Sequence, residues 1–175
     1  MSLTSDQFEQ QAQALYPALY RRILRLVGDR DLAEDVLQEV LLQGWQARDQ
    51  LRDQNRLAGW LMAIATRMAL TAAQARQQRR GRWLALDETG LAGSAPGTAE
   101  SVEFAEEVQT AWAALATLAP RQRAAFVLCS VEGCTVAQAA ACLGITAGAV
   151  KRHLSRARNQ LRRRLAPYWN EEEDA

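Results

Sequence analysis

The chain has 175 residues, of which 49% are hydrophobic and 23% charged, and its formal net charge is +1. This length suits one or two small domains, and this hydrophobic content excludes a chain that is disordered as a whole. No apolar run reaches the ~20 residues that span a bilayer, and the polar first residues lack the pattern of a signal peptide. We therefore expect a cytoplasmic protein.

The composition predicts an all-α fold, because Ala, Leu, Gln and Arg dominate and alternating β-branched runs are absent. Small polar residues and helix breakers cluster at residues 87–100, where helical periodicity disappears. Such a segment is typical of a flexible linker. We therefore expect two small helical domains, at residues 6–86 and 101–168.

The first domain begins with two predicted helices. Apolar residues recur at helical spacing in the first of them, at Leu15, Leu19, Ile23, Leu26 and Val27. A turn at residues 28–30 follows, and Asp31 with Glu34 three positions later predicts a capping box at the start of the second helix. The buried side of this second helix is expected to contain Val36, Leu37, Val40, Leu41 and Gly44.

The opposite side of the second helix is polar and mostly acidic. Its residues are Asp31, Glu34, Asp35, Gln38 and Glu39. Because carboxylates repel phosphates, this face is unsuited to nucleic acid. It is either a solvated helix face or a docking surface for a basic protein partner.

A loop and a third helix complete the first domain. The loop, residues 49–56, is dense in hydrogen-bonding side chains that suit an unstacked base, namely Arg52, Asp53, Gln54, Asn55 and Arg56. The helix is predicted over residues 57–80, with an apolar side that includes Trp60, Leu61, Ile64, Ala65, Met68 and Leu70. Its basic residues, Arg67, Arg76, Arg79, Arg80 and the following Arg82, form a first cationic patch.

The second domain is predicted to contain four helices. Ser101 is placed to cap the first, whose inner face we expect to contain Val108, Ala111, Trp112 and Leu115. Pro120 suits the first turn of the second helix. The last two helices are expected on either side of a turn at Gly144, a residue that readily adopts the left-handed conformation.

The last two helices have the pattern of a helix-turn-helix. Thr135 and Gln138 predict a capping box for one helix, and Thr146 predicts the cap of the other. We expect Val150, Leu154, Ala157 and Leu161 to point inward, which leaves Lys151, Arg152, Ser155, Arg156 and Asn159 facing outward. Residues 120–164 hold nine basic residues and one acidic residue, a net charge of +8. This second cationic patch indicates contact with a DNA major groove.

The three cysteines and the single histidine do not indicate a metal or a cofactor. Cys129, Cys134 and Cys142 include no CxxC pair, and the histidine is His153. We interpret the cysteines as small buried residues of a reducing compartment, and a redox or metal role stays open.

Taken in order, these motifs resemble the extracytoplasmic-function (ECF) subfamily of bacterial RNA polymerase sigma factors. Residues 31–40 resemble the core-binding helix, residues 59–65 followed by Arg76 resemble the promoter −10 helix, and residues 118–123 through Arg158 resemble the −35 domain. The resemblance covers nearly the whole chain. It implies a protein that binds core polymerase and directs promoter recognition, DNA melting and transcription initiation, and that is not an enzyme.

The resemblance also implies partners and roles. The residues that bind the polymerase β′ clamp helices would be Asp31, Glu34, Asp35, Gln38 and Glu39, and the β subunit is a further partner. The −10 element would be held by Arg52, Asp53, Gln54, Asn55, Arg56, Trp60, Arg67, Arg76, Arg79 and Arg80. The −35 element would be read by Arg121, Thr146, Lys151, Arg152, Ser155 and Arg156. An anti-sigma factor, which in this family is often membrane-bound, would hold the protein inactive, and no small-molecule substrate is implied.

Two other classes share part of this pattern. A helix-turn-helix regulator that works without polymerase normally needs a ligand-binding or dimerisation domain, and residues 6–86 offer neither a clear pocket nor a long heptad seam. An adaptor that mimics a sigma factor and titrates an anti-sigma factor should lack the dense basic patches. An enzyme is disfavoured, because His153 has no evident acid–base partner. The promoter sequence, the inducing signal and the anti-sigma partner stay open.

Overall fold

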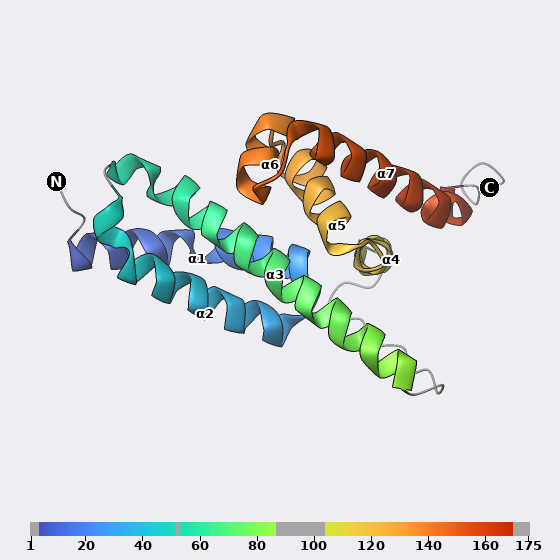
Figure 1. Cartoon of the computed structure of the whole chain (residues 1–175), viewed down its shortest axis with the longest axis horizontal. Helices are drawn as coiled ribbons and strands as arrows, with labels where there is room; N and C mark the ends of the chain where they lie inside the picture. Colours follow the sequence, from blue (N-terminus) through green and yellow to red (C-terminus); the bar gives the residue numbers. More distant parts are fainter. Residues whose placement is uncertain (1–3, 52, 87–103, 170–175) are drawn as a thin grey trace. The chain divides into compact units, whose positions relative to one another are not determined.

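A computed structural model describes residues 4–51, 53–86 and 104–169, so the predicted linker and Ser101 lie outside the described part. Within these ranges the regular secondary structure is entirely helical, which confirms the predicted all-α class (Figure 1). The chain separates into two compact units, residues 1–81 and 82–175. None of the helices in the described ranges combines the length and the apolar character that crossing a membrane requires.

The first unit is built from three long helices, α1 (Ser5–Val27), α2 (Arg30–Gln46) and α3 (Leu57–Leu86), and only the last residues of α3, 82–86, are assigned to the second unit. Two short 3₁₀ helices, η1 (Arg48–Gln50) and η2 (Gln54–Arg56), connect α2 to α3. The core between the three helices contains the fully buried residues Leu19, Ile23, Leu26, Leu37, Val40, Leu57 and Leu61. Because all of these are apolar and recur at helical spacing, burial of one stripe per helix stabilises the unit.

The helices of the first unit approach one another closely at Gly44. A Cβ atom at this position would lie 2.6 Å from the Leu61 side chain and 3.3 Å from the ring of Phe8. The Phe8 ring in turn meets Trp45 edge to face, with ring centroids 5.6 Å apart. Gly44 therefore lets α2 pack against both α1 and α3 at one point.

The start of α2 differs from the prediction. The N-cap is Asp29, whose Oδ1 accepts a hydrogen bond from the Leu32 amide at 2.9 Å, so the expected capping box at Asp31 was wrong. Gly28 ends α1 in the left-handed conformation, with φ 69°, and the backbone of Asp29 is already extended. The cap therefore forms two residues earlier than expected, and Asp31 lies in the first helical turn.

The second unit contains α4 (Phe104–Ala116), α5 (Pro120–Phe126), α6 (Val136–Leu143) and α7 (Ala147–Trp169). Pro120 occupies the first turn of α5, as predicted. A π-helical turn, η3 (Val127–Val131), continues α5 and was not predicted. The residues buried around α5, η3, α6 and α7 include Ala124, Ala125, Val127, Leu128, Ala139, Val150 and Ala157.

The buried face of α4 was predicted correctly only in part, because Leu115 packs against the buried cluster whereas Ala111 and Trp112 are exposed, and the side chain of Val108 lies outside the described part. Trp112 is 37% exposed, whereas Ala114 and the following Leu118 are buried against Ala157 and Leu161 of α7. Apolar residues lie on several sides of α4, so helical spacing alone allowed more than one face. The end of α4 is closed by the buried Arg123, whose Nη2 donates to the carbonyl oxygen of Ala116 at 2.7 Å.

Candidate functional site

The first candidate surface is the acidic face of α2. All five predicted residues, Asp31, Glu34, Asp35, Gln38 and Glu39, are exposed, while Ala33, Val36, Leu37, Val40 and Gly44 are buried on the other side. Asp35 and Glu39 lie one helical turn apart and form no ion pair with any described residue. Their carboxylates are therefore available to cationic groups of another molecule.

A groove runs between this acidic face and α3. Asp35 and Glu39 line its acidic wall, and Ile64, Met68 and Ala72 of α3 contribute an apolar surface. A helix that carries both basic and apolar side chains would match these two chemistries.

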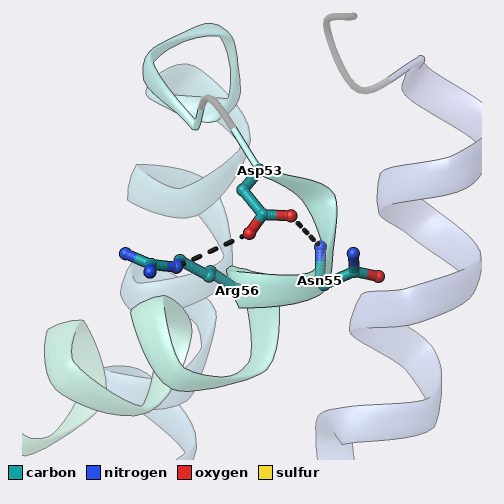
Figure 2. Close-up of polar contacts among 3 residues, drawn as sticks. All are labelled: Asp53, Asn55 and Arg56. Atoms are coloured by element: carbon teal, nitrogen blue, oxygen red, sulfur yellow. Dashed lines mark hydrogen bonds and ion pairs between the residues drawn. The ribbon is translucent and has the colours of Figure 1, made fainter.

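The second candidate surface is the connection between α2 and α3, where two 3₁₀ turns replace the loop expected at residues 49–56. Asp53 organises its end, because Oδ1 accepts a hydrogen bond from the Asn55 amide at 3.0 Å and Oδ2 lies 3.5 Å from Arg56 Nε (Figure 2). Asn55 and Arg56 are exposed, and the Asn55 side chain is not engaged by Asp53 (Figure 2). Arg52 and the side chain of Gln54 lie outside the described part.

Helix α3 follows directly and carries the arginines of the first cationic patch. Arg67, Arg79 and Arg80 are exposed, and Trp60 is half-buried at the start of the helix. Arg76 behaves differently, since its Nη2 lies 2.7 Å from Oδ2 of Asp29 in an ion pair. This guanidinium is therefore engaged within the first unit, and the exposed arginines are the ones freely presented to phosphate.

The third candidate surface is the helix-turn-helix formed by α6 and α7. Thr135 and Gln138 make the predicted capping box, with hydrogen bonds of 2.8 and 3.2 Å. Gly144 ends α6 at φ 63°, and Thr146 Oγ1 accepts from the Ala149 amide at 3.2 Å. These local contacts confirm the predicted turn between the two helices.

The orientation of α7 also agrees with the prediction. Val150, Leu154, Ala157 and Leu161 are buried. Lys151, Arg152, Ser155, Arg156 and Asn159 are exposed, as is Arg121 in the first turn of α5. The second unit therefore presents a row of long donor side chains on one helix, as major-groove recognition requires.

His153 lies on α7 among these cations. Burial lowers its pKa below the ordinary value of 6.5, and the nearby charges of Arg121, Arg156 and Arg152 lower it further. Its Nδ1 atom is buried and has no hydrogen-bond partner among the described residues. The imidazole is therefore neutral at pH 7 and serves as a packing residue beside the cationic surface.

Comparison with known proteins fits this arrangement of surfaces. Residues 12–80 match the model of Sigma-70 region 2, and residues 109–161 match that of Sigma-70 region 4. The ECF RNA polymerase sigma factor SigL of Mycobacterium tuberculosis is 34% identical over 146 residues, which cover 82% of this chain and 80% of SigL. The chain belongs to the ECF sigma factor family.

Other similarities agree with this assignment. The ECF sigma factor SigE of Mycolicibacterium smegmatis is 31% identical over 87% of this chain, and the chain spans only 59% of the length of SigE. Among solved structures, sigma factor RpoE of Bartonella quintana, crystallised with the anti-sigma factor NepR, matches with a TM-score of 0.67 and 28% identity. That match covers 91% of this chain and 96% of RpoE.

One residue of the region 2 surface was missed by the sequence analysis. Leu42 is 50% exposed on α2, although it is a large hydrophobic residue. It follows Gln38 by one helical turn and therefore adds an exposed apolar side chain to the acidic face. The spacing from Gln38 in the sequence places Leu42 on this face, but burial of apolar residues is the usual rule, and the sequence pattern therefore indicated only the apolar residues on the other side of the helix.

The structure brings the predicted residues together in three surfaces. The acidic residues share α2, the candidate base-binding residues Asn55 and Arg56 share η2, and the candidate −35 residues lie on α7 and at the start of α5. Arg76 stands apart because it pairs with Asp29. Thr146 also has a structural role, because its hydroxyl caps α7.

Proposed function

We propose that this chain is a transcription initiation factor that binds core RNA polymerase through region 2 and directs it to promoters through regions 2 and 4. The observation that supports this proposal is the opposite chemistry of its two helical surfaces. Helix α2 exposes Asp35 and Glu39, which form no ion pair with the residues that the structure describes, and α7 exposes Lys151, Arg152 and Arg156. The first suits a basic protein surface and the second suits DNA phosphates and base edges.

In this proposal the acidic face contacts the β′ clamp helices, and the polymerase β subunit provides a further contact. Asp35, Gln38 and Glu39 form the charged and polar part of the contact, while Leu42 supplies an apolar anchor. An exposed apolar side chain surrounded by polar groups is the common arrangement at the centre of a protein interface.

The promoter contacts divide between the two regions. Asn55 and Arg56 of η2 hold an unstacked base of the −10 element, and Arg67, Arg79 and Arg80 hold the backbone near the melted segment. Arg152 and Arg156 read base edges of the −35 element in the major groove. Duplex binding by the free chain is weak, because the described part of the chain contains a single helix-turn-helix and the net charge is only +1.

An anti-sigma factor is the partner that keeps such a protein inactive in the cytoplasm. The similarity to RpoE, whose structure was solved with the anti-sigma factor NepR, supports this part of the proposal. The exposed acidic face of α2 and the groove beside it provide a surface that an inhibitor and polymerase would compete for.

Run-off transcription with purified core polymerase on a promoter from the gene's own operon tests the proposal. We expect a discrete transcript only when core enzyme and this chain are both present. Tight, sequence-specific duplex binding by the isolated chain, without stimulation of core polymerase, would instead identify a regulator that works without polymerase. Binding to an anti-sigma factor without any transcript would identify an adaptor.

A further inference from the structure

Two cysteine side chains share one groove beside the recognition helix of region 4. Cys129 in η3 and Cys134 just before α6 line one side of this groove, and Lys151, Ser155 and Arg158 of α7 line another. The third cysteine, Cys142, lies on α6 and does not line the groove. All three are thiols in the structure, and each is half-buried rather than fully buried as the sequence suggested.

The backbone holds the two groove cysteines close together. Gly133 has φ +69°, a left-handed conformation that turns the chain back on η3. The Cys134 amide then donates to the Leu128 carbonyl oxygen at 2.9 Å. Because Leu128 precedes Cys129 directly, this bond keeps the Cα atoms of Cys129 and Cys134 within about 7 Å of each other, the outer limit for a disulfide.

We propose that Cys129 and Cys134 form a reversible disulfide when a hydroperoxide reaches region 4, and that this disulfide weakens −35 recognition. The site stands on the geometry of these two thiols alone, and its effect on the promoter rests on the proposed function. In the first step the Cys134 thiolate attacks the peroxide oxygen, which yields a sulfenic acid and releases an alcohol, or water if the oxidant is hydrogen peroxide.

The second step closes the disulfide. The Cys129 sulfur attacks the sulfenic sulfur, and water leaves with the Cys129 proton. In total, two thiols are oxidised and one hydroperoxide is reduced. Burial raises the pKa of the Cys129 thiol, although the nearby Arg158 charge opposes this rise, and the raised pKa disfavours Cys129 as the attacking thiolate. The proposal therefore gives the first step to Cys134, the other thiol of the groove.

The disulfide acts on DNA recognition through the start of α6. Cys134 immediately precedes Thr135, whose capping box with Gln138 begins this helix. A disulfide requires a sulfur separation of about 2.05 Å and a specific dihedral angle, so the two free thiols must shift toward each other, and in the proposal the segment at Cys134 takes up part of this shift. Helix α6 has only eight residues, so disturbance of its cap shifts the first helix of the helix-turn-helix against α7.

The chemical test uses the full chain, treated with hydrogen peroxide, alkylated, unfolded and digested with a protease that cleaves after glutamate. Glu132 lies between the two cysteines, so their disulfide joins two fragments that separate after reduction. We expect the joined fragments in the wild type and in the matched control Cys142→Ser, but not in Cys129→Ser or Cys134→Ser. Full alkylation of the peroxide-treated wild type, or linkage of Cys129 to Cys142, overturns the proposal.

The functional test measures promoter binding by the reconstituted holoenzyme. Oxidation should lower the affinity for a −35-containing promoter roughly tenfold, the effect of one lost base contact, in the wild type and in Cys142→Ser. Dithiothreitol should restore it, and Cys129→Ser should not respond to peroxide. If the disulfide form binds the promoter with unchanged affinity, the proposal that the disulfide weakens −35 recognition is overturned. If the reduced holoenzyme directs no transcript, the proposed function fails, whereas the fragment test still decides the disulfide.

Discussion

Asp29 caps α2 and at the same time forms an ion pair with Arg76 of α3, with 2.7 Å between Oδ2 and Nη2. One carboxylate thus joins the start of the candidate polymerase-binding helix to the basic half of the candidate −10 helix. The pair is only partly exposed, with side-chain exposures of 31% for Asp29 and 40% for Arg76. Arg76 therefore contributes to the structure of region 2 itself.

Substitutions at Asp29 should separate the contribution of the helix cap to the free energy of unfolding from the contribution of the ion pair. Asp29→Asn keeps an N-cap side chain, so we expect it to lower the free energy of unfolding by only ~0.2–1 kcal/mol. Asp29→Ala also removes the cap and should lower it by a further ~1 kcal/mol. Urea denaturation of both variants measures the two contributions, with the exposed Asp31→Asn as the control. Equal stability of Asp29→Asn and the wild type would show that the ion pair contributes nothing.

Charge reversal on α2 should weaken core polymerase binding without unfolding the chain. Asp35→Lys combined with Glu39→Lys removes two exposed carboxylates and places cations opposite a basic partner. We expect at least roughly tenfold weaker binding to core enzyme, because like charges across an interface repel. A pull-down and a titration with core enzyme measure this, and circular dichroism checks the fold. Glu9→Lys on α1 makes one such charge reversal at another exposed position and should bind normally, so it is compared with each single α2 variant.

Leu42→Ala should weaken the same interaction through lost apolar contact. Because Leu42 is 50% exposed in the free chain, its truncation should change the stability of the fold by no more than about 0.5 kcal/mol. A buried apolar anchor at an interface is worth more than ~1 kcal/mol, so core affinity should fall roughly tenfold. Tyr16→Ala on α1, where the side chain is 47% exposed, is the matched control. Normal core binding by Leu42→Ala would place Leu42 outside the interface.

The basic residues of α7 should divide into base-reading and phosphate-binding groups. Arg152→Ala or Arg156→Ala should relax preference at one or two −35 bases by ~1–3 kcal/mol. Substitution of Arg162, Arg163 and Arg164 should instead weaken binding evenly and reduce the salt slope by about one unit per lost contact. Promoter activity across single-base variants distinguishes the groups. Asn55→Ala should alter only the −10 preference, and a change in −35 preference from this variant would contradict the division.

His153 should titrate below its ordinary pKa of 6.5, because burial and then the charges of Arg121, Arg156 and Arg152 disfavour the charged imidazole. Below pH 6.5 the unfolded chain then binds more protons than the folded chain, so stability should fall as the pH drops from 6.5 toward the lowered pKa. His153 is the only histidine, so its imidazole NMR signals report this titration without ambiguity.

Arg121→Ala should raise the pKa of His153 toward its ordinary value. Arg164→Ala serves as the control. Arg164 lies on α7, the helix that carries His153, but about 16 Å from it along the helix axis, which is beyond the ~8 Å screening length. A pKa at or above the ordinary value, or an equal shift in both variants, would contradict the assigned environment.

The sequence by itself determined the features that depend on neighbours a few residues apart. The Thr135 capping box, the Gly144 turn, the Thr146 cap and the outward face of α7 all agree with the structure. Each depends on backbone and side-chain groups within one or two helical turns, so local spacing was sufficient. The acidic face of α2 could be predicted for the same reason, although the cap at Asp29 could not, because two nearby carboxylates fit the pattern.

Only the tertiary structure decided the features that depend on packing between distant segments. The Asp29–Arg76 ion pair, the buried face of α4 and the shared groove of Cys129 and Cys134 each bring different elements together. Periodicity identifies apolar positions on a helix, but Trp112 satisfies it and is still exposed, whereas Leu42 lies outside the apolar stripe of α2. Whether such residues are buried depends on which face of their helix the other helices cover. The packing of all the helices together decides this, and the sequence of one helix alone does not.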